Sequence, residues 1–134
     1  MPFTRASALC TASTVFATIF VGFGINAILR PAHALTFFEL VMSPSISAAD
    51  QNLIEAMTVI YGARDIFIGC AIYVAAFFGK GKSGEKVLGW ILLATAAQAV
   101  VDGVVCKWMV GDGEWAHWGY APVVAITGAL LIRS

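Results

Sequence analysis

The fold is decided by residues 53–78, which read LIEAMTVIYGARDIFIGCAIYVAAFF. This run is long enough to cross a bilayer, because about 20 apolar residues span about 30 Å of hydrocarbon. Near its middle, Arg64 and Asp65 place opposite charges side by side. An ionisable residue at that depth is costly and rarely faces lipid, so the stretch predicts a buried polar site with partners on other helices.

The composition is that of a membrane protein. The chain has 134 residues, of which 60% are hydrophobic and 12% charged, far from the balance of soluble proteins. We therefore expect one integral membrane domain over residues 1–134, in contact with the lipid bilayer. The formal net charge is zero and indicates no nucleic-acid partner.

The sequence predicts no metal and no cofactor. Cys10, Cys70 and Cys106 lie within apolar segments at no metal-ligand spacing, and we interpret them as packing residues. No glycine-rich phosphate loop, HExxH, paired CxxC or GxSxG motif occurs.

Four long apolar stretches predict an all-α protein, an antiparallel bundle of four transmembrane helices. Residues 31–42 are too few to cross and predict a short interfacial helix between the first two spans, which either lies at the membrane interface or folds over the mouth of the bundle. Arg30 precedes Pro31 and so ends the first span, while Ser47 or Asp50 caps the second. The predicted spans are residues 8–29, 51–78, 87–108 and 115–132, with turns at 79–86 and 111–114.

Basic residues predict the orientation. An even number of spans places both termini on one side, and Lys80, Lys82 and Lys86 share that side with Arg5 and Arg133. The positive-inside rule therefore predicts cytoplasmic termini, and in a eukaryote we expect an endomembrane location. Three tryptophans predict an aromatic belt at the opposite surface: Trp108, Trp115 and Trp118.

Two carboxyl groups are expected to meet at one depth. Asp65 lies 14 residues before Gly79, and Asp102 lies 16 residues after Lys86. At about 1.5 Å per residue, both lie about 21–24 Å from the turn that joins their helices. His117 is expected near the same level, because it follows the last turn closely.

Further polar side chains surround this pair. Tyr61 and Gln98 each lie four residues before an aspartate, on the same helical face. We predict Asp65, Asp102 and Arg64 as catalytic residues. Substrate contacts are predicted for Tyr61, Gln98, His117, Asn26 and Glu55, the last two toward the mouth.

These residue types suggest acid–base chemistry. Two carboxylates in a low-dielectric site resist ionising together, so one tends to keep a proton. An acid beside a carboxylate, both oriented by a guanidinium, is an acid–base pair. The same Asp-Arg-Asp trio opens epoxides in enzymes similar to limonene-epoxide hydrolase, where the carboxylate activates water and the acid protonates the epoxide oxygen. This likeness is one of chemistry and implies no shared fold.

Several motifs resemble a family of small four-helix membrane proteins from fungi and bacteria whose domain has no assigned function. The resemblance covers most of the chain and is carried by Arg30-Pro31, Gly62-Ala63-Arg64-Asp65 with Gly69, Val101-Asp102-Gly103 and Ala116-His117. The chain is also similar in outline to DoxX-like four-helix proteins. The resemblance suggests a link with secondary-metabolite biosynthesis and implies no established activity.

Two functions follow from these observations. The first is a membrane-embedded, cofactor-independent enzyme that acts on a lipophilic small molecule by epoxide opening, as a hydrolase or cyclase. Asp65 and Asp102 would divide the base and acid roles, with Arg64 orienting them. The second is a non-catalytic bundle, a partner-binding subunit or small carrier, in which Arg64 and Asp102 form a structural ion pair. A carrier would require a homo-oligomer, because one bundle has little room for alternating access.

Overall fold

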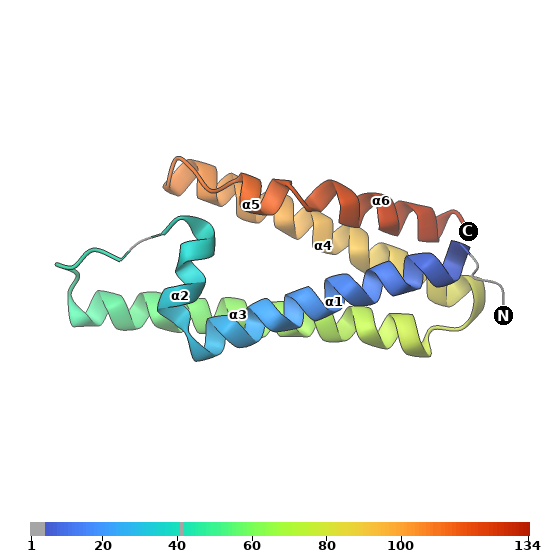
Figure 1. The fold of residues 1–134 in the computed structure, drawn as a ribbon, viewed down its shortest axis with the longest axis horizontal. Helices are drawn as coiled ribbons and strands as arrows, with labels where there is room; N and C mark the ends of the chain where they lie inside the picture. The colour runs from blue at the N-terminus through green and yellow to red at the C-terminus, as the bar shows by residue number, and fades with distance from the viewer. Residues whose placement is uncertain (1–4, 41) are drawn as a thin grey trace.

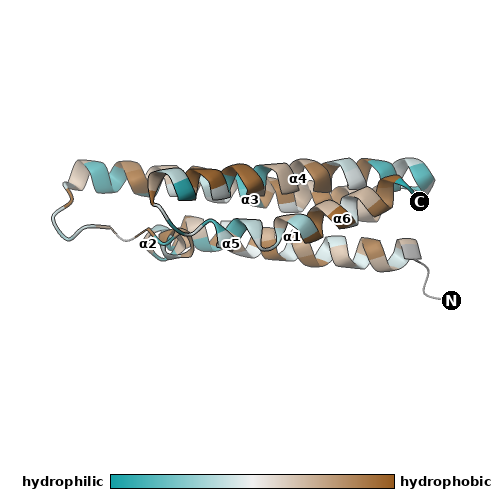
Figure 2. Ribbon diagram, turned by 90° about the horizontal axis from the view of Figure 1, so that it is seen from above, coloured by the Kyte–Doolittle hydropathy of each residue, from teal (hydrophilic) through white to brown (hydrophobic). Residues whose placement is uncertain are grey.

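The computed structural model describes residues 5–40 and 42–134 as a helical bundle (Figure 1). Four stretches in this part of the chain are long and apolar enough to cross a membrane. The beginning of the first helix and the C-terminus lie at the same end, and hydrophobic residues run along all the long helices (Figure 2). The predicted all-α, four-span bundle is confirmed. Its elements are α1 (Arg5–Leu29), α2 (Pro31–Leu35), η1 (Thr36–Phe38), α3 (Ala48–Phe78), α4 (Gly81–Met109), α5 (Trp115–Trp118) and α6 (Ala121–Ile132).

The long helices pack as two close pairs, α1 with α3 and α4 with α6. A Cβ atom on Gly24 of α1 would lie 2.5 Å from the carbonyl oxygen of Gly62 on α3. In the second pair, a Cβ atom on Gly89 of α4 would lie 2.6 Å from the carbonyl oxygen of Gly128 on α6. Small residues thus allow backbone-to-backbone contact, which drives helix association in lipid.

The two pairs join through an apolar core toward the end that carries the termini. Ile72 of α3, Leu92 of α4 and Val124 of α6 are fully buried there. The pairs diverge toward the other end, where α2 runs crosswise between them (Figure 1). The fully packed part of the bundle therefore lies at one end only. The buried core consists of Ala17, Phe20, Ile72, Ala75, Leu88, Leu92, Ala96, Val124 and Leu131.

The segment after α1 folds over the mouth of the bundle, as predicted. Arg30 leaves the helical region before Pro31, with φ −142° and ψ 65°, so α1 ends at Leu29 and a short helix follows. The ring of Phe38 in η1 lies 4.9 Å from the ring of Tyr61 on α3 and 5.0 Å from that of His117 on α5. This segment thereby connects the two helix pairs at the open end. Residue 41, within the predicted segment, lies outside the described residues.

The predicted turn at residues 79–86 is wrong, because α4 already begins at Gly81. Two glycines explain the shorter reversal. A Cβ atom on Gly84 would overlap the carbonyl carbon of Gly79, so the chain can turn back on itself here only without a side chain at residue 84. The polar residues after Gly81 therefore form the first turns of a helix.

The predicted single helix over residues 115–132 is interrupted. The span divides into α5 and α6 at Gly119 and Tyr120. Pro122 accounts for the break, because it lacks an N–H group and its ring would clash with the carbonyl of Trp118 in a continuous helix. Trp118 also turns toward α4, where its indole N–H donates to the carbonyl of Val100 at 3.2 Å.

The second span begins at Ala48, three residues before the predicted start at residue 51. Ser47 is the cap, since its hydroxyl accepts a hydrogen bond from the backbone N–H of Asp50 at 3.1 Å. The Ser47 hydroxyl also donates to the carboxylate of Asp50 at 2.7 Å. Both capping candidates therefore take part, with Ser47 at the cap position.

We predict that Gly24→Ala destabilises the bundle by about 1–3 kcal/mol, because the new methyl group overlaps the backbone of α3. Thermal unfolding of the purified protein in detergent measures the effect. Gly22→Ala is the matched control, because a Cβ atom there meets nothing within 4 Å. Equal melting temperatures for the two variants would contradict the assigned glycine contact.

Candidate active site

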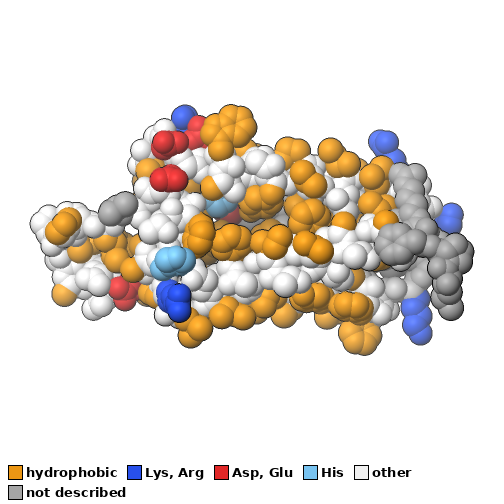
Figure 3. All heavy atoms as spheres, in the orientation of Figure 1, with side chains coloured by type: hydrophobic (Ala, Val, Ile, Leu, Met, Phe, Trp, Pro, Cys, Tyr) orange, Lys and Arg blue, Asp and Glu red, His pale blue; other side chains and the backbone are white. Residues whose placement is uncertain are grey.

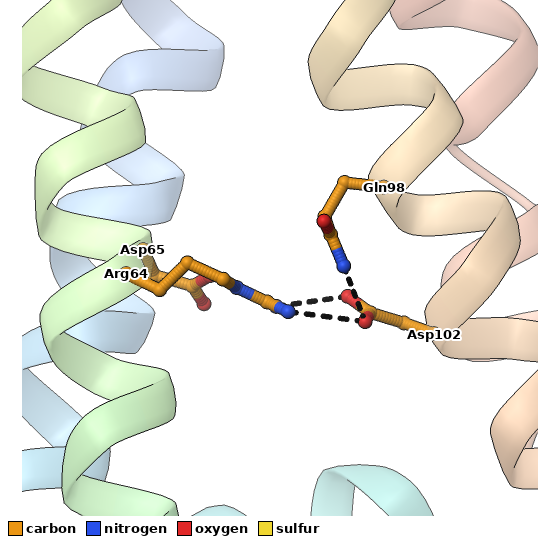
Figure 4. A network of polar contacts seen from close by, with 4 residues as sticks. All are labelled: Arg64, Asp65, Gln98 and Asp102. Atoms are coloured by element: carbon orange, nitrogen blue, oxygen red, sulfur yellow. Dashed lines mark hydrogen bonds and ion pairs between the residues drawn. The ribbon is translucent and has the colours of Figure 1, made fainter.

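A charged cluster joins the two helix pairs near the middle of α3 (Figure 4). Arg64 of α3 reaches across to Asp102 of α4 and donates two hydrogen bonds to its carboxylate, at 3.1 and 2.8 Å. Such bidentate pairs are the strongest that arginine forms with carboxylates. Gln98, one turn before Asp102, donates a further hydrogen bond to the same carboxylate at 3.1 Å.

The same guanidinium also contacts Asp65, its neighbour in sequence. Arg64 Nη2 lies 3.3 Å from Asp65 Oδ1, and the guanidinium carbon lies 4.1 Å from the centre of the Tyr61 ring. The cluster therefore contains five residues that we predicted from sequence. The depth of Asp102 was estimated from a turn at residues 79–86 that is longer than the real one. The residues meet nevertheless, because the arginine side chain spans the space between the diverging helices.

The two aspartates differ in burial and surroundings. The side chain of Asp65 is 3% exposed, that of Asp102 is 14% exposed and that of Arg64 is 31% exposed. Asp65 borders a cavity, whereas Arg64 and Asp102 are not among its lining residues. Within this cluster, Asp65 is therefore the charged residue placed to contact a molecule in the cavity.

The cavity has a volume of about 280 Å³ and lies between α1, η1, α3 and α5. Figure 3 shows a hollow between α1 and the α5–α6 span, with histidine and acidic side chains visible in its depth. This side of the bundle carries many exposed hydrophobic side chains, so the hollow opens on an apolar surface. The cavity is lined by Phe16, Ile19, Phe20, Phe23, Ala27, Ala34, Phe37, Phe38, Tyr61, Asp65, Ala116, His117 and Tyr120.

His117 shares this cavity with Asp65. The residue is 5% exposed, and its ring stacks on that of Phe38 with an interplanar angle of 29°. Neither ring nitrogen has a hydrogen-bond partner among the described residues. A buried polar group without a partner is rare in proteins and points toward the cavity as the source of one.

The turn before His117 is held by a second ion pair, which our sequence analysis missed. Lys107 Nζ lies 2.8 Å from Glu114 Oε1 and also donates to the carbonyl of Gly111 at 3.2 Å. The hydrogen bond from Lys107 holds the pKa of Glu114 below its ordinary value. The carbonyl of Glu114 accepts from the backbone N–H of His117 at 3.1 Å, so this pair helps to position the imidazole.

Three predicted substrate contacts lie away from the cavity. Asn26 is at the α1–α2 corner, where its side-chain oxygen lies 3.1 Å from His33 Nδ1. Glu55 accepts from Gln51 at 2.9 Å, about 15 Å along α3 from Asp65. Gln98 is occupied by Asp102. None of the three is a lining residue, because each occupies a different level or face of its helix.

The aromatic lining of the cavity was also missed at the sequence level. Tyr120 borders the cavity beside Asp65, together with five phenylalanines. A usable signal was present in α1, where Phe16, Phe20 and Phe23 recur at the spacing of one helical face. In a helix that is apolar all round, this spacing alone does not distinguish a cavity wall from a lipid-facing surface.

Within residues 5–40 and 42–134, which the structure describes, no group of three or more His, Cys, Asp or Glu side chains could hold a metal ion. The three cysteines are free thiols. Cys106 is buried and Cys70 is exposed on α3. The polar groups that border the cavity are thus a carboxyl, an imidazole and two phenols.

A comparison with protein families matches residues 17–131 to DUF4267, a domain of unknown function. The match contains Arg64, Asp65, Asp102 and His117, and it is consistent with the expected small membrane family whose domain has no assigned function. Comparisons with curated proteins and with solved structures found no match. Because the matched region covers most of the chain, the protein belongs to the DUF4267 family.

Proposed function

We propose that this protein is a membrane-embedded acid–base enzyme that opens an epoxide in a lipophilic metabolite without a cofactor. One observation carries the proposal: the carboxyl group of Asp65, held by Arg64, borders an apolar cavity that opens on the hydrophobic surface of the bundle. A lipophilic substrate would enter that cavity laterally from the bilayer. Hydrolase and cyclase are the two outcomes of such an epoxide opening.

Charge balance supports an acid role for Asp65. Arg64 makes its two shorter contacts with Asp102, so these opposite charges compensate one another. The contact with Asp65 is single and, at 3.3 Å, the longest of the three. A proton on Asp65 makes the cluster neutral in surroundings where an uncompensated charge is costly. Asp65 would then meet a bound substrate as a carboxylic acid.

The reaction follows from that state. Asp65 donates its proton to the oxirane oxygen as the C–O bond breaks. A nucleophile, either water or a hydroxyl of the same molecule, attacks the carbon and then returns a proton to Asp65. Water yields a diol and an internal hydroxyl yields a cyclic ether, with no change of oxidation state overall. Arg64 stabilises the carboxylate that exists between the two proton transfers.

The geometry favours different roles for the two aspartates. The sequence-based hypothesis divided acid and base between Asp65 and Asp102. Since Asp102 is held by Arg64 and Gln98 and does not border the cavity, we assign it a positioning role. Asp65 then serves as acid first and as base afterwards. Tyr61 and His117 border the same space and would contact the substrate.

We predict that Asp65→Asn lowers epoxide turnover by a factor of about 10²–10⁴, the usual contribution of a general acid. The assay follows mono- and sesquiterpenoid epoxides in membranes that contain the protein and separates diols from cyclic ethers by gas chromatography. Asp112→Asn, the same change at an exposed loop residue, is the control. Full turnover by Asp65→Asn at normal abundance would refute the assignment.

The second candidate is a non-catalytic bundle that binds a partner protein or works as a small carrier in an oligomer. The observation that favours it is the bidentate pair between Arg64 and Asp102, which ties the helix pairs together away from the cavity. In this case the cluster would stabilise the fold without contacting any substrate.

For this structural role we predict that Asp102→Asn costs about 3–5 kcal/mol, because it leaves Arg64 without its counter-charge. The double variant Arg64→Leu with Asp102→Leu should recover much of the loss, since it removes both charges. Abundance in membranes and thermal unfolding in detergent measure the two effects. Additive losses in the double variant would argue against a coupled pair.

We also propose that the termini face the cytoplasm and, if the host is eukaryotic, that the protein lies in an endomembrane. The similarity to DoxX-like proteins would then reflect a shared four-helix arrangement. Figure 3 shows basic side chains gathered at the end of the bundle where the termini lie. They belong to a face that includes Lys80, Lys82, Lys86 and Arg133. Such a face stays on the cytoplasmic side.

We predict that a green fluorescent protein fused after Ser134 fluoresces in bacteria, whereas alkaline phosphatase at the same position is inactive. The reason is that the first folds only in the cytoplasm and the second only outside it. Fusions within the Gly111–Gly113 turn should give the opposite pattern and serve as the control. An active phosphatase after Ser134 would reverse the orientation.

A further inference from the structure

The unpartnered imidazole of His117 and the size of the cavity together indicate what the cavity binds. We propose that it holds a hydroxylated lipophilic molecule about as large as two fused rings, with the hydroxyl group bonded to His117. Binding of this molecule does not depend on the proposed function. Only the fate of the hydroxyl group, described below, rests on it.

His117 requires a partner that the described part of the chain does not supply. A buried donor or acceptor without a hydrogen bond costs about 1–3 kcal/mol. Neutral imidazole has one donor nitrogen and one acceptor nitrogen, and both are buried without a partner. A hydroxyl group can donate to one nitrogen or accept from the other, so it suits either tautomer. A ketone could satisfy only the donor.

The imidazole is also fixed in place before a ligand binds. Its ring stacks on Phe38, with centroids 5.0 Å apart. The backbone N–H of His117 donates to Glu114, which is anchored by Lys107. A preorganised hydrogen-bonding group loses little entropy on binding and selects for the position of the hydroxyl group.

Volume and lining set the size and chemistry of the rest of the molecule. An apolar cavity of 150 Å³ accepts benzene, so a cavity of about 280 Å³ accommodates roughly two rings, or ten to fifteen carbon atoms. Aromatic side chains form most of the wall. At the rim, Ile19, Phe23 and Phe37 are partly exposed and lead from the lipid side into the cavity.

Combined with the proposed function, the hydroxyl site at His117 gives positions for two groups of one substrate, an epoxide and a hydroxyl. Its epoxide would lie against Asp65 and its hydroxyl group against His117, because both residues border the same small cavity. The substrate class is then an epoxy alcohol. Attack of the hydroxyl oxygen on the epoxide carbon, with proton transfer through Asp65, gives a hydroxylated cyclic ether as an isomer of the substrate. His117 acts in this scheme by orienting the nucleophile.

The test compares 2-naphthol with naphthalene, which has the same rings without the hydroxyl group. Binding to the full-length protein in lipid nanodiscs is measured after subtraction of empty nanodiscs. We expect saturable binding of 2-naphthol by the wild type. His117→Phe should weaken the binding of 2-naphthol about tenfold more than it weakens the binding of naphthalene, because one hydrogen bond is lost. His117→Gln, which keeps a donor and an acceptor, should retain much of the preference.

A second measurement follows binding to the wild type and needs no variant at position 117. The chain has two histidines, His33 and His117, so labelling with ¹⁵N-histidine gives two sets of imidazole signals. 2-Naphthol should shift the signals of His117 and leave those of His33 unchanged, while naphthalene should shift the His117 nitrogens much less. The exposed variant His33→Gln assigns the two sets.

The outcomes separate this inference from the proposed function. Absence of saturable binding, or unchanged His117 signals with 2-naphthol, overturns the inference even if epoxides are turned over. A hydroxyl preference that depends on His117 supports it even if no epoxide reacts. Asp112→Asn, at an exposed loop residue outside the cavity, should leave the binding of 2-naphthol unchanged.

Discussion

A guanidinium within a hydrocarbon layer must find its hydrogen-bond acceptors in the protein, and Arg64 finds them on a helix of the opposite pair. Its two bonds to Asp102 connect α3 with α4 at a level where the apolar core no longer joins them. The arginine side chain spans this space (Figure 4). The arrangement of the open end of the bundle therefore depends on a charged contact, whereas that of the closed end depends on packing.

The glycines explain why this separation is stable. Each helix pair is joined by backbone contact, at Gly24 with Gly62 and at Gly89 with Gly128. Each pair therefore behaves as a unit, and the space between the two units can differ along the bundle. At one end Ile72 and Leu92 fill it. At the other end Phe38 and the short helix α2 cover it only in part, which leaves a cavity that opens on an apolar surface.

The site combines a charged group with a dry, aromatic space. Asp102 accepts hydrogen bonds from Arg64 and Gln98 and does not border the cavity. Asp65 has one weaker contact with the same arginine and borders the cavity. This asymmetry suits a reaction in which one carboxyl group gives and then takes back a proton.

The sequence by itself determined the four spans and the end of α1 at Arg30-Pro31, because a long apolar run in lipid must form a helix and a proline ends it. It also determined the polar cluster, because charged side chains within the membrane must find partners in the protein. This cluster consists of Arg64, Asp65, Asp102, Gln98 and Tyr61. It did not determine where α4 begins, because the short turn depends on the close contact between Gly79 and Gly84 and on the positive φ of Gly81. Nor could it separate Asp65, which borders the cavity, from Asp102, which does not. That distinction, like the aromatic wall around His117, depends on how the two helix pairs diverge, and such packing between distant segments is decided only in the folded structure.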